Sequence, residues 1–278
     1  MKKTLSIILL LCLCFGVVSC TPEEKSYISE ISDIAFDCDA YFDNEAWFFS
    51  SYLKLEPKTI ELKGVEYMGE YEETEANDDY GGNIKRDYYY VGDGVSFAVE
   101  SGTDRIVYFR QAFLDLKTES VRGETSKLTI AQDIAKQYLG DLFLYDLKSE
   151  TLYVSENGVD YGTKYTYTKR VQGYSTTDFL CVSVTNSGKI EKLSIGQTGA
   201  FDSIEKINTE KIEESISNVL AENFEKDGTV ITEKLSCGKR IVLLESGEVH
   251  LASCYYVWTK GADGAEKYEY VTVLTHLE

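Results

Sequence analysis

Cys20 is the residue whose surroundings point most specifically to chemistry. It follows small residues at positions 17–19, which end an apolar run over positions 5–15 that begins after Lys2 and Lys3. This run is shorter than the roughly 18 residues that a membrane-spanning helix needs, and its cationic start and small-residue end are typical of a removable export signal. A thiol at that one position is what diacylglycerol transfer requires. The sequence therefore predicts a signal peptide over residues 1–19 and lipid attachment at Cys20.

Lipid attachment at Cys20 would make the chain a bacterial lipoprotein, held at the cell membrane on its extracytoplasmic side. Residues 20–25 would then form the lipidated cysteine and a short polar tether, so the folded part would begin close to the membrane. One acyl chain, such as palmitate, gives only marginal membrane binding, whereas two or three anchor a protein durably. An ordinary secretory signal and a buried helix at the start of the chain are the two alternatives.

The net charge limits the partners of the chain. It carries 28 basic and 47 acidic residues, a formal net charge of −19 at pH 7. Such a charge excludes nucleic acid as a partner and disfavours contact with an anionic lipid surface, so attachment would depend on the lipid at Cys20. The charge fits simple solubility at a cell surface, and it also fits a cationic partner.

Four of the seven cysteines lie beyond the predicted signal and lipidation site, and none of them is in a CxxC pair. Cys237 and Cys254 are the most plausible disulfide pair, because two strands around a turn would place them opposite each other. A chain of this length can build a core without a disulfide, so buried free thiols are an equally weighted alternative. The other two cysteines are Cys38 and Cys181.

Other catalytic or metal-binding patterns are missing from the sequence. His250 and His276 are the only histidines, without HExxH spacing, and there is neither a GxSxG elbow nor a glycine-rich phosphate loop. Residues 51–54 and 203–206 fit SxxK but lack the companion motifs. We therefore predict no catalytic residue, no metal and no cofactor, although 47 acidic residues leave paired-carboxylate hydrolysis open.

Aromatic residues in strand-like segments offer a platform for a sugar or a peptide, although sheet tyrosines more often pack across strands. These residues are Tyr88, Tyr89, Tyr90, Tyr165, Tyr167, Tyr255, Tyr256, Trp258, Tyr268 and Tyr270.

Residues 26–113 are predicted to form a β-rich N-terminal domain. Alternation of apolar and polar residues, or β-branched and aromatic enrichment, indicates six strands. The acidic stretch 70–82 is expected to be a solvated hairpin tip, because it lacks the spacing of a calcium loop. The strands are expected at residues 34–42, 47–55, 59–67, 86–91, 95–100 and 105–109.

A boundary is expected at residues 114–127. A helix followed by a meander of antiparallel strands is expected after it, and this unit occurs twice in succession. The first helix is predicted to begin at a capping box formed by Thr129 and Gln132 and to end at Gly140. Asn208 or Thr209 caps the second helix. A strand, Ser-Gly turn and strand in residues 95–109 also recurs in residues 179–195. Strands are expected at 142–154, 163–172, 178–185, 189–195, 229–236, 240–244, 248–259 and 266–276.

The helix opening at residues 128–135 (LTIAQDIA) and the turn at residues 186–190 (NSGKI) resemble the PepSY-like modules of bacterial surface proteins. The resemblance covers residues 120–200 and, more loosely, 205–278. It implies an α+β fold in which a helix packs on each antiparallel meander, without catalytic residues. Modules of this kind are thought to bind or restrain peptidases, so an envelope peptide or protein is the expected partner.

We thus expect a non-enzymatic binding or regulatory lipoprotein, recognisable by an exposed sheet edge or tyrosine face. A cell-surface hydrolase or carbohydrate-active enzyme would instead need a concave site with convergent carboxylates. A structural assembly subunit would self-associate and bind no ligand.

Overall fold

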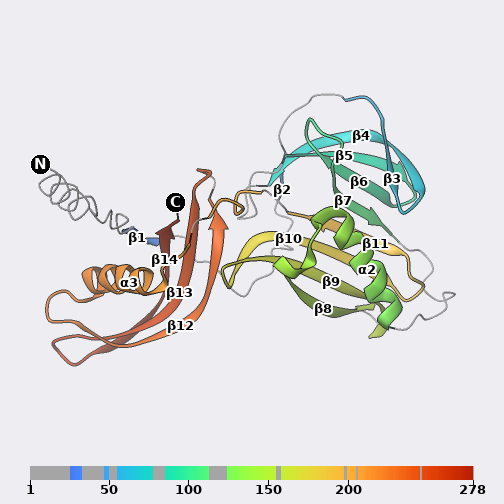
Figure 1. The fold of residues 1–278 in the computed structure, drawn as a ribbon. Helices are drawn as coiled ribbons and strands as arrows, with labels where there is room; N and C mark the ends of the chain where they lie inside the picture. The colour runs from blue at the N-terminus through green and yellow to red at the C-terminus, as the bar shows by residue number, and fades with distance from the viewer. Residues whose placement is uncertain are drawn as a thin grey trace, which may run out of the picture.

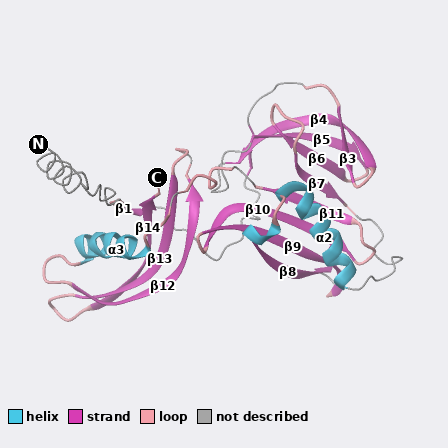
Figure 2. Cartoon of the chain, in the orientation of Figure 1, coloured by secondary structure: helices cyan, strands magenta, loops and turns pink. Residues whose placement is uncertain are grey.

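In the described residues the fold is mostly β, with two α-helices and one large, open and largely antiparallel sheet (Figures 1 and 2). The strand order is β1-β14-β13-β12-β10-β11-β7-β6-β5-β4-β2, with β3 on β4 and β8 and β9 branching from β10. The computed structural model describes residues 26–32, 47–49, 55–77, 85–112, 124–154, 158–196, 199–204, 206–244 and 246–277.

The first lobe contains β2 to β11 and α2, on the right in Figure 1. Its core includes Phe97 and Phe109 from the early strands, Leu180 from a late strand, and Ile134 from α2, all fully buried. The elements are β2 (Trp47–Phe49), β3 (Lys58–Leu62), β4 (Val65–Asn77), β5 (Lys85–Gly92), β6 (Val95–Glu100), β7 (Ile106–Gln111), α2 (Glu124–Leu139), η1 (Leu142–Leu144), β8 (Tyr145–Val154), β9 (Val159–Val171), β10 (Tyr174–Thr185) and β11 (Ile190–Ile195).

Two meanders join in this lobe through their last strands. β7 pairs antiparallel with β11, and Phe109 lies opposite Leu193. Each of these residues is the fourth of its strand, so the recurring turn motif of residues 95–109 and 179–195 is seen in the structure as two copies related by an approximate two-fold axis. The sheet and the core therefore cross the boundary expected at residues 114–127.

The second lobe contains β1 (Ser29–Ser32), α3 (Thr209–Phe224), β12 (Val230–Leu243), β13 (Val249–Lys260) and β14 (Glu266–His276), on the left in Figure 1. The buried side chains of α3, Ile212, Ile216 and Leu220, pack against these strands. The link to the first lobe is a short parallel pairing of residues 175–176 of β10 with residues 240–241 of β12.

The N-terminal strand completes the second lobe. β1 pairs antiparallel with β14, so β12-β13-β14-β1 has as many strands as β8-β9-β10-β11. Ser215 Oγ of α3 donates to the Tyr27 carbonyl at 3.1 Å, and the Asn208 N–H donates to Tyr27 Oη at 2.9 Å. Residues 26–32 thus pack with the C-terminal unit rather than with the expected β-rich domain 26–113.

Several predicted element boundaries are wrong for identifiable reasons. Residues 59–67 form a hairpin of β3 and β4 rather than one strand, because Lys63 and Gly64 adopt positive φ in a tight turn. The acidic residues 70–77 lie in β4 rather than in a loop tip. Their ladder with β5, which runs from Glu70 opposite Tyr90 to Ala76 opposite Lys85, makes them part of the sheet.

The helix and strand limits after residue 120 are corrected in the same way. α2 begins at Glu124, so Thr129 is inside the helix and is not its N-cap residue. β12 is one strand where two strands and a turn were expected, because a bulge between Ser236 and Gly238 absorbs the irregular residues. The ends at Gly140, with φ +73°, and at Asn208, whose side chain accepts from the Lys211 N–H, are confirmed. The strand expected at 34–42 lies outside the described residues.

The two separate cores predict separate unfolding transitions. We expect Ile134→Ala and Ile216→Ala each to cost about 2 to 5 kcal/mol, because both remove a fully buried side chain and leave a cavity. Calorimetry of the chain from Thr21 onward should show each variant lowering a different transition. Asn218→Ala, on the exposed face of α3, is the control and should move neither. A single transition shifted equally by both variants would contradict this organisation.

Candidate functional site

The free edge of β14 is the first part of the candidate site. β1 covers only residues 272–275 of β14, and within the described part of the chain no strand pairs with residues 266–271 on that side. The His276 N–H donates to the Ile28 carbonyl, and the next N–H, of Leu277, donates to Val249 on β13. Backbone groups alternate along a strand, so residues 266 and 268 direct their N–H and C=O groups to the side of β14 that β1 does not cover.

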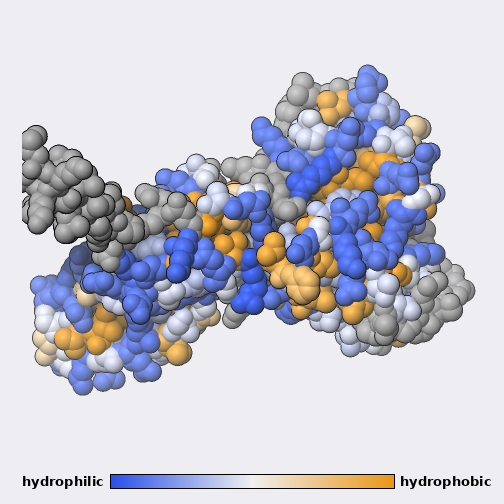
Figure 3. All heavy atoms as spheres, in the orientation of Figure 1, coloured by the Kyte–Doolittle hydropathy of each residue, from blue (hydrophilic) through white to orange (hydrophobic). Residues whose placement is uncertain are grey.

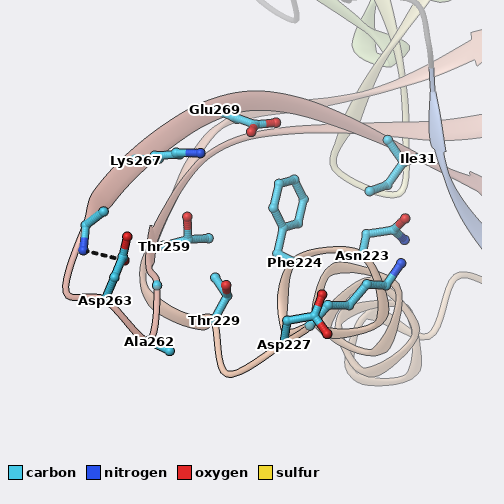
Figure 4. A pocket seen from close by; sticks show the side chains of 13 residues that line it. Ile31, Asn223, Phe224, Asp227, Thr229, Thr259, Ala262, Asp263, Lys267 and Glu269 are labelled. Atoms are coloured by element: carbon cyan, nitrogen blue, oxygen red, sulfur yellow. Dashed lines mark hydrogen bonds between the residues drawn. The ribbon is translucent and has the colours of Figure 1, made fainter.

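A groove lies beside this edge, on the face of the sheet that carries α3. It has a volume of about 770 Å³ and is bounded by the C-terminal end of α3, the residues before β12 and the β13–β14 turn (Figure 4). Phe224 projects from the end of α3 into the hollow. The charged residues that line the groove are Lys226, Asp227, Asp263, Lys267 and Glu269.

Aromatic side chains cover the opposite face of the same two strands. Tyr256 lies 5.3 Å from Tyr270 and 6.4 Å from Tyr268 between ring centroids, and Trp258 lies 6.1 Å from Tyr268. Tyr268 is 66% exposed, and Tyr256 and Tyr270 are more than a third exposed. We call Tyr256, Trp258, Tyr268 and Tyr270 the aromatic ladder. Leu235 of β12, opposite Tyr256, extends its apolar surface.

The three features converge on one strand. β14 separates the groove from the ladder, and among the described residues no strand other than β13 pairs with its residues 266–269. An extended peptide added along this edge would place alternate side chains over the groove and over the ladder, because successive side chains of a strand point to opposite faces. The arrangement can therefore bind an extended chain through its backbone and select it through its side chains.

The structure divides the aromatic residues predicted as a platform into core and surface. Tyr89, Tyr165, Tyr167 and Tyr255 are buried in the two cores, and burial raises the pKa of Tyr167 to about 12. Tyr88 packs against Tyr108 at 5.5 Å, and Tyr90 is exposed on β5. Only residues from β13 and β14 form a continuous exposed aromatic surface, as far as the structure describes the chain.

The structure holds Cys181, Cys237 and Cys254 as free cysteines. Cys254 lies opposite Gly238, next to Cys237 at the bulge of β12, and both thiols belong to one apolar cluster. Their disulfide stays a prediction. Cys20 and Cys38 lie outside the described residues, and so does the lipidation that the sequence predicts.

His250 and His276 lie opposite each other on β13 and β14, with ring centroids 5.1 Å apart. Within the described residues no group of three or more histidine, cysteine or acidic side chains could hold a metal ion. Of the two SxxK segments, residues 51–54 lie outside the description, and residues 203–206 fall in the connection before α3.

Sequence reasoning found the aromatic residues of the site but missed the groove and the open edge. The groove is built from the end of α3, a turn and the face of β14, and no local pattern connects these segments. The register of β1 on β14, which in the described residues ends at Ser32 opposite Thr272, has no signal in the sequence.

Comparison with known proteins finds no matching family model, no matching curated protein and no matching solved structure. No helix in the described part of the chain is both long and apolar enough to cross a membrane.

The buried histidine predicts a pH-dependent stability. Burial lowers the pKa of His250 below its ordinary value, and the neighbouring His276 lowers it further, whereas Glu248 and Glu30 oppose this. The unfolded chain then binds a proton more tightly than the folded one, so the free energy of unfolding falls as the pH drops from about 7 to about 5. His250→Gln should flatten this fall in chemical denaturation, and His276→Gln should flatten it less. An unchanged pH profile in His250→Gln would contradict the assignment.

Proposed function

We propose that this chain is a non-enzymatic, membrane-anchored binding lipoprotein that captures an extended segment of an envelope peptide or protein. The observation that carries the proposal is the edge of β14 at residues 266–269, which lies between the groove and the aromatic ladder and pairs with β13 alone in the described part of the chain. Strand addition supplies main-chain hydrogen bonds without regard to sequence, and the two faces supply selectivity.

The chemistry of the two faces defines the partner. Aromatic faces attract cations and apolar side chains, and the groove holds three carboxylates and two ammonium groups around Phe224. Together with the net charge of −19, this favours a partner segment that alternates basic with apolar or aromatic residues. The association rate of such a basic segment would be higher at low ionic strength, because the acidic protein then attracts it over longer distances.

The proposed lipid on Cys20 would place this site near the membrane. Tyr27 lies seven positions after Cys20 and is held by two hydrogen bonds, one to Ser215 of α3 and one to Asn208, its N-cap residue. An extended chain of that length reaches at most roughly 25 Å, so the second lobe would stay within that distance of the bilayer and the first lobe would project away. Partners at the membrane surface would meet the β14 edge first.

The PepSY-like resemblance fits this proposal. In each lobe one helix packs on a four-stranded meander, although β1 supplies the last strand of the second. Restraint of an envelope peptidase by occupying its extended substrate cleft is then one form that the binding function takes.

A hydrolase using paired carboxylates is the second candidate. The observation in its favour is that Asp227, Asp263 and Glu269 line one groove. Such an enzyme would cleave what it binds, so mass spectrometry of a bound peptide or glycan after incubation separates the two candidates.

The proposed strand addition is tested by a backbone substitution. Peptides of twelve residues selected from a phage-displayed random library would serve as probes. Tyr268→Pro removes an N–H that points to the open edge and leaves the pairing with β13 intact, so the fold should persist. We expect its dissociation constant to be at least about tenfold higher than that of Tyr268→Ala, since only the proline blocks the added strand.

The matched alanine variant removes the same side chain and keeps the backbone N–H. Isothermal titration of both variants and of the unmodified chain gives the comparison, with thermal unfolding as a check on folding. Equal affinities of Tyr268→Pro and Tyr268→Ala, or a library that yields no binder, would refute strand addition at this edge.

A further inference from the structure

β8 is a second open edge, at the other end of the molecule from the β14 site. This ten-residue strand pairs along its whole length with β9, and within the described residues it pairs with no other strand. The side chains of its residues 145–153 are all exposed or half-buried. Long unpaired edges template the pairing of another chain unless they are short, bulged or covered, and β8 is none of these at its centre.

Apolar side chains lie along this edge beside the charged residues Asp146, Lys148 and Glu150. Phe143, just before β8, is 98% exposed, Leu147 is 44% exposed and Tyr153 is 60% exposed. Figure 3 shows apolar surface over η1 and β8 at the lower side of the first lobe. Such a strip favours association over solvation.

The charges on β8 are arranged symmetrically about Ser149. Lys148 and Glu150 flank it, lie on the same face and form an ion pair at 3.0 Å. If two copies of β8 pair antiparallel with Ser149 opposite the partner's Ser149, each Lys148 lies opposite the partner's Glu150. The four charges then alternate in sign around the two-fold axis, which is favourable for directly opposed cross-strand pairs.

The same register matches the other face of the strand. Leu147 would lie opposite the partner's Thr151, and Tyr145 opposite the partner's Tyr153. A two-fold axis perpendicular to the sheet requires a register centred on a residue. The next symmetric registers on either side are centred on Lys148 or Glu150 and place two like charges opposite each other. The register centred on Ser149 avoids the like-charge pairs that both of its neighbouring registers contain.

We propose that β8 is a homodimer interface, in which two copies of this chain extend their sheets into one another through antiparallel β8 strands centred on Ser149. The partner that fits this edge is a second copy because its charge and apolar patterns complement themselves in reverse. This interface is separate from the β14 edge, so the dimer would carry two binding sites.

A charge-swap series tests the register. Lys148→Glu and Glu150→Lys each place like charges opposite each other in the dimer, whereas the double variant restores the complementarity. Sedimentation equilibrium of the chain from Thr21 onward should give a dimer for the unmodified chain and the double variant. Each single variant should raise the dimer dissociation constant by at least about tenfold, because two like-charged pairs oppose association.

Mixing the two single variants provides the decisive measurement. In the Lys148→Glu chain positions 148 and 150 are both acidic, and in the Glu150→Lys chain both are basic. The two variants should therefore form a heterodimer with each other, while neither dimerises strongly alone. Lys206→Glu, an exposed change in the second lobe with the same charge difference, is the control and should leave dimerisation unchanged.

Every outcome decides the proposal. An unmodified chain that stays monomeric at about 100 μM would overturn it. Pairing of two ten-residue edges buries a small interface, so its dissociation constant should be higher than that of a large interface but still low enough to measure at this concentration. A dimer that is insensitive to both single variants, or single variants that fail to associate on mixing, would overturn the β8 register.

Discussion

Backbone hydrogen bonding at strand edges is the constraint on which this structure depends. A sheet of fourteen strands in this order exposes edges wherever a meander ends, and an unpaired edge recruits whatever strand fits it. The chain satisfies its edges internally at three places, where β7 meets β11, β10 meets β12, and β1 meets β14. Of the edges without a second pairing strand in the described residues, those on β14 and β8 are the places where function is proposed.

The helices and most strands could be predicted from the sequence because their signals are local. The stripe of Ile212, Ile216 and Leu220 defines a helix, and Asn208 and Gly140 mark helix ends by their hydrogen-bonding and backbone preferences. Prediction from local sequence failed for residue types that occur both in loops and in strands. The charged residues of β4 and the Cys237-Gly238 pair both look like a loop, but long-range pairing with neighbouring strands makes them part of strands.

The arrangement of lobes could not be predicted from the sequence, since it depends on pairs of residues far apart in the chain. Ser29 and Thr275 are joined by a hydrogen bond of 2.8 Å across 246 positions. No local sequence pattern near either residue predicts this pairing. The aromatic residues of the site were visible in the sequence, but four tyrosines from the same list are core residues. Exposure, which separates the two groups, is a property of the assembled sheet.

The central claim is that an extended partner adds to the free edge of β14. Amide hydrogen exchange, resolved by NMR on the chain with and without a saturating library-selected peptide, tests this most directly. The account predicts new protection at the amide of Tyr268, which points to the side of β14 that β1 does not cover, with little change at Lys267 and Glu269, which already face β13. Protection confined to other segments, or none on β14, would contradict it.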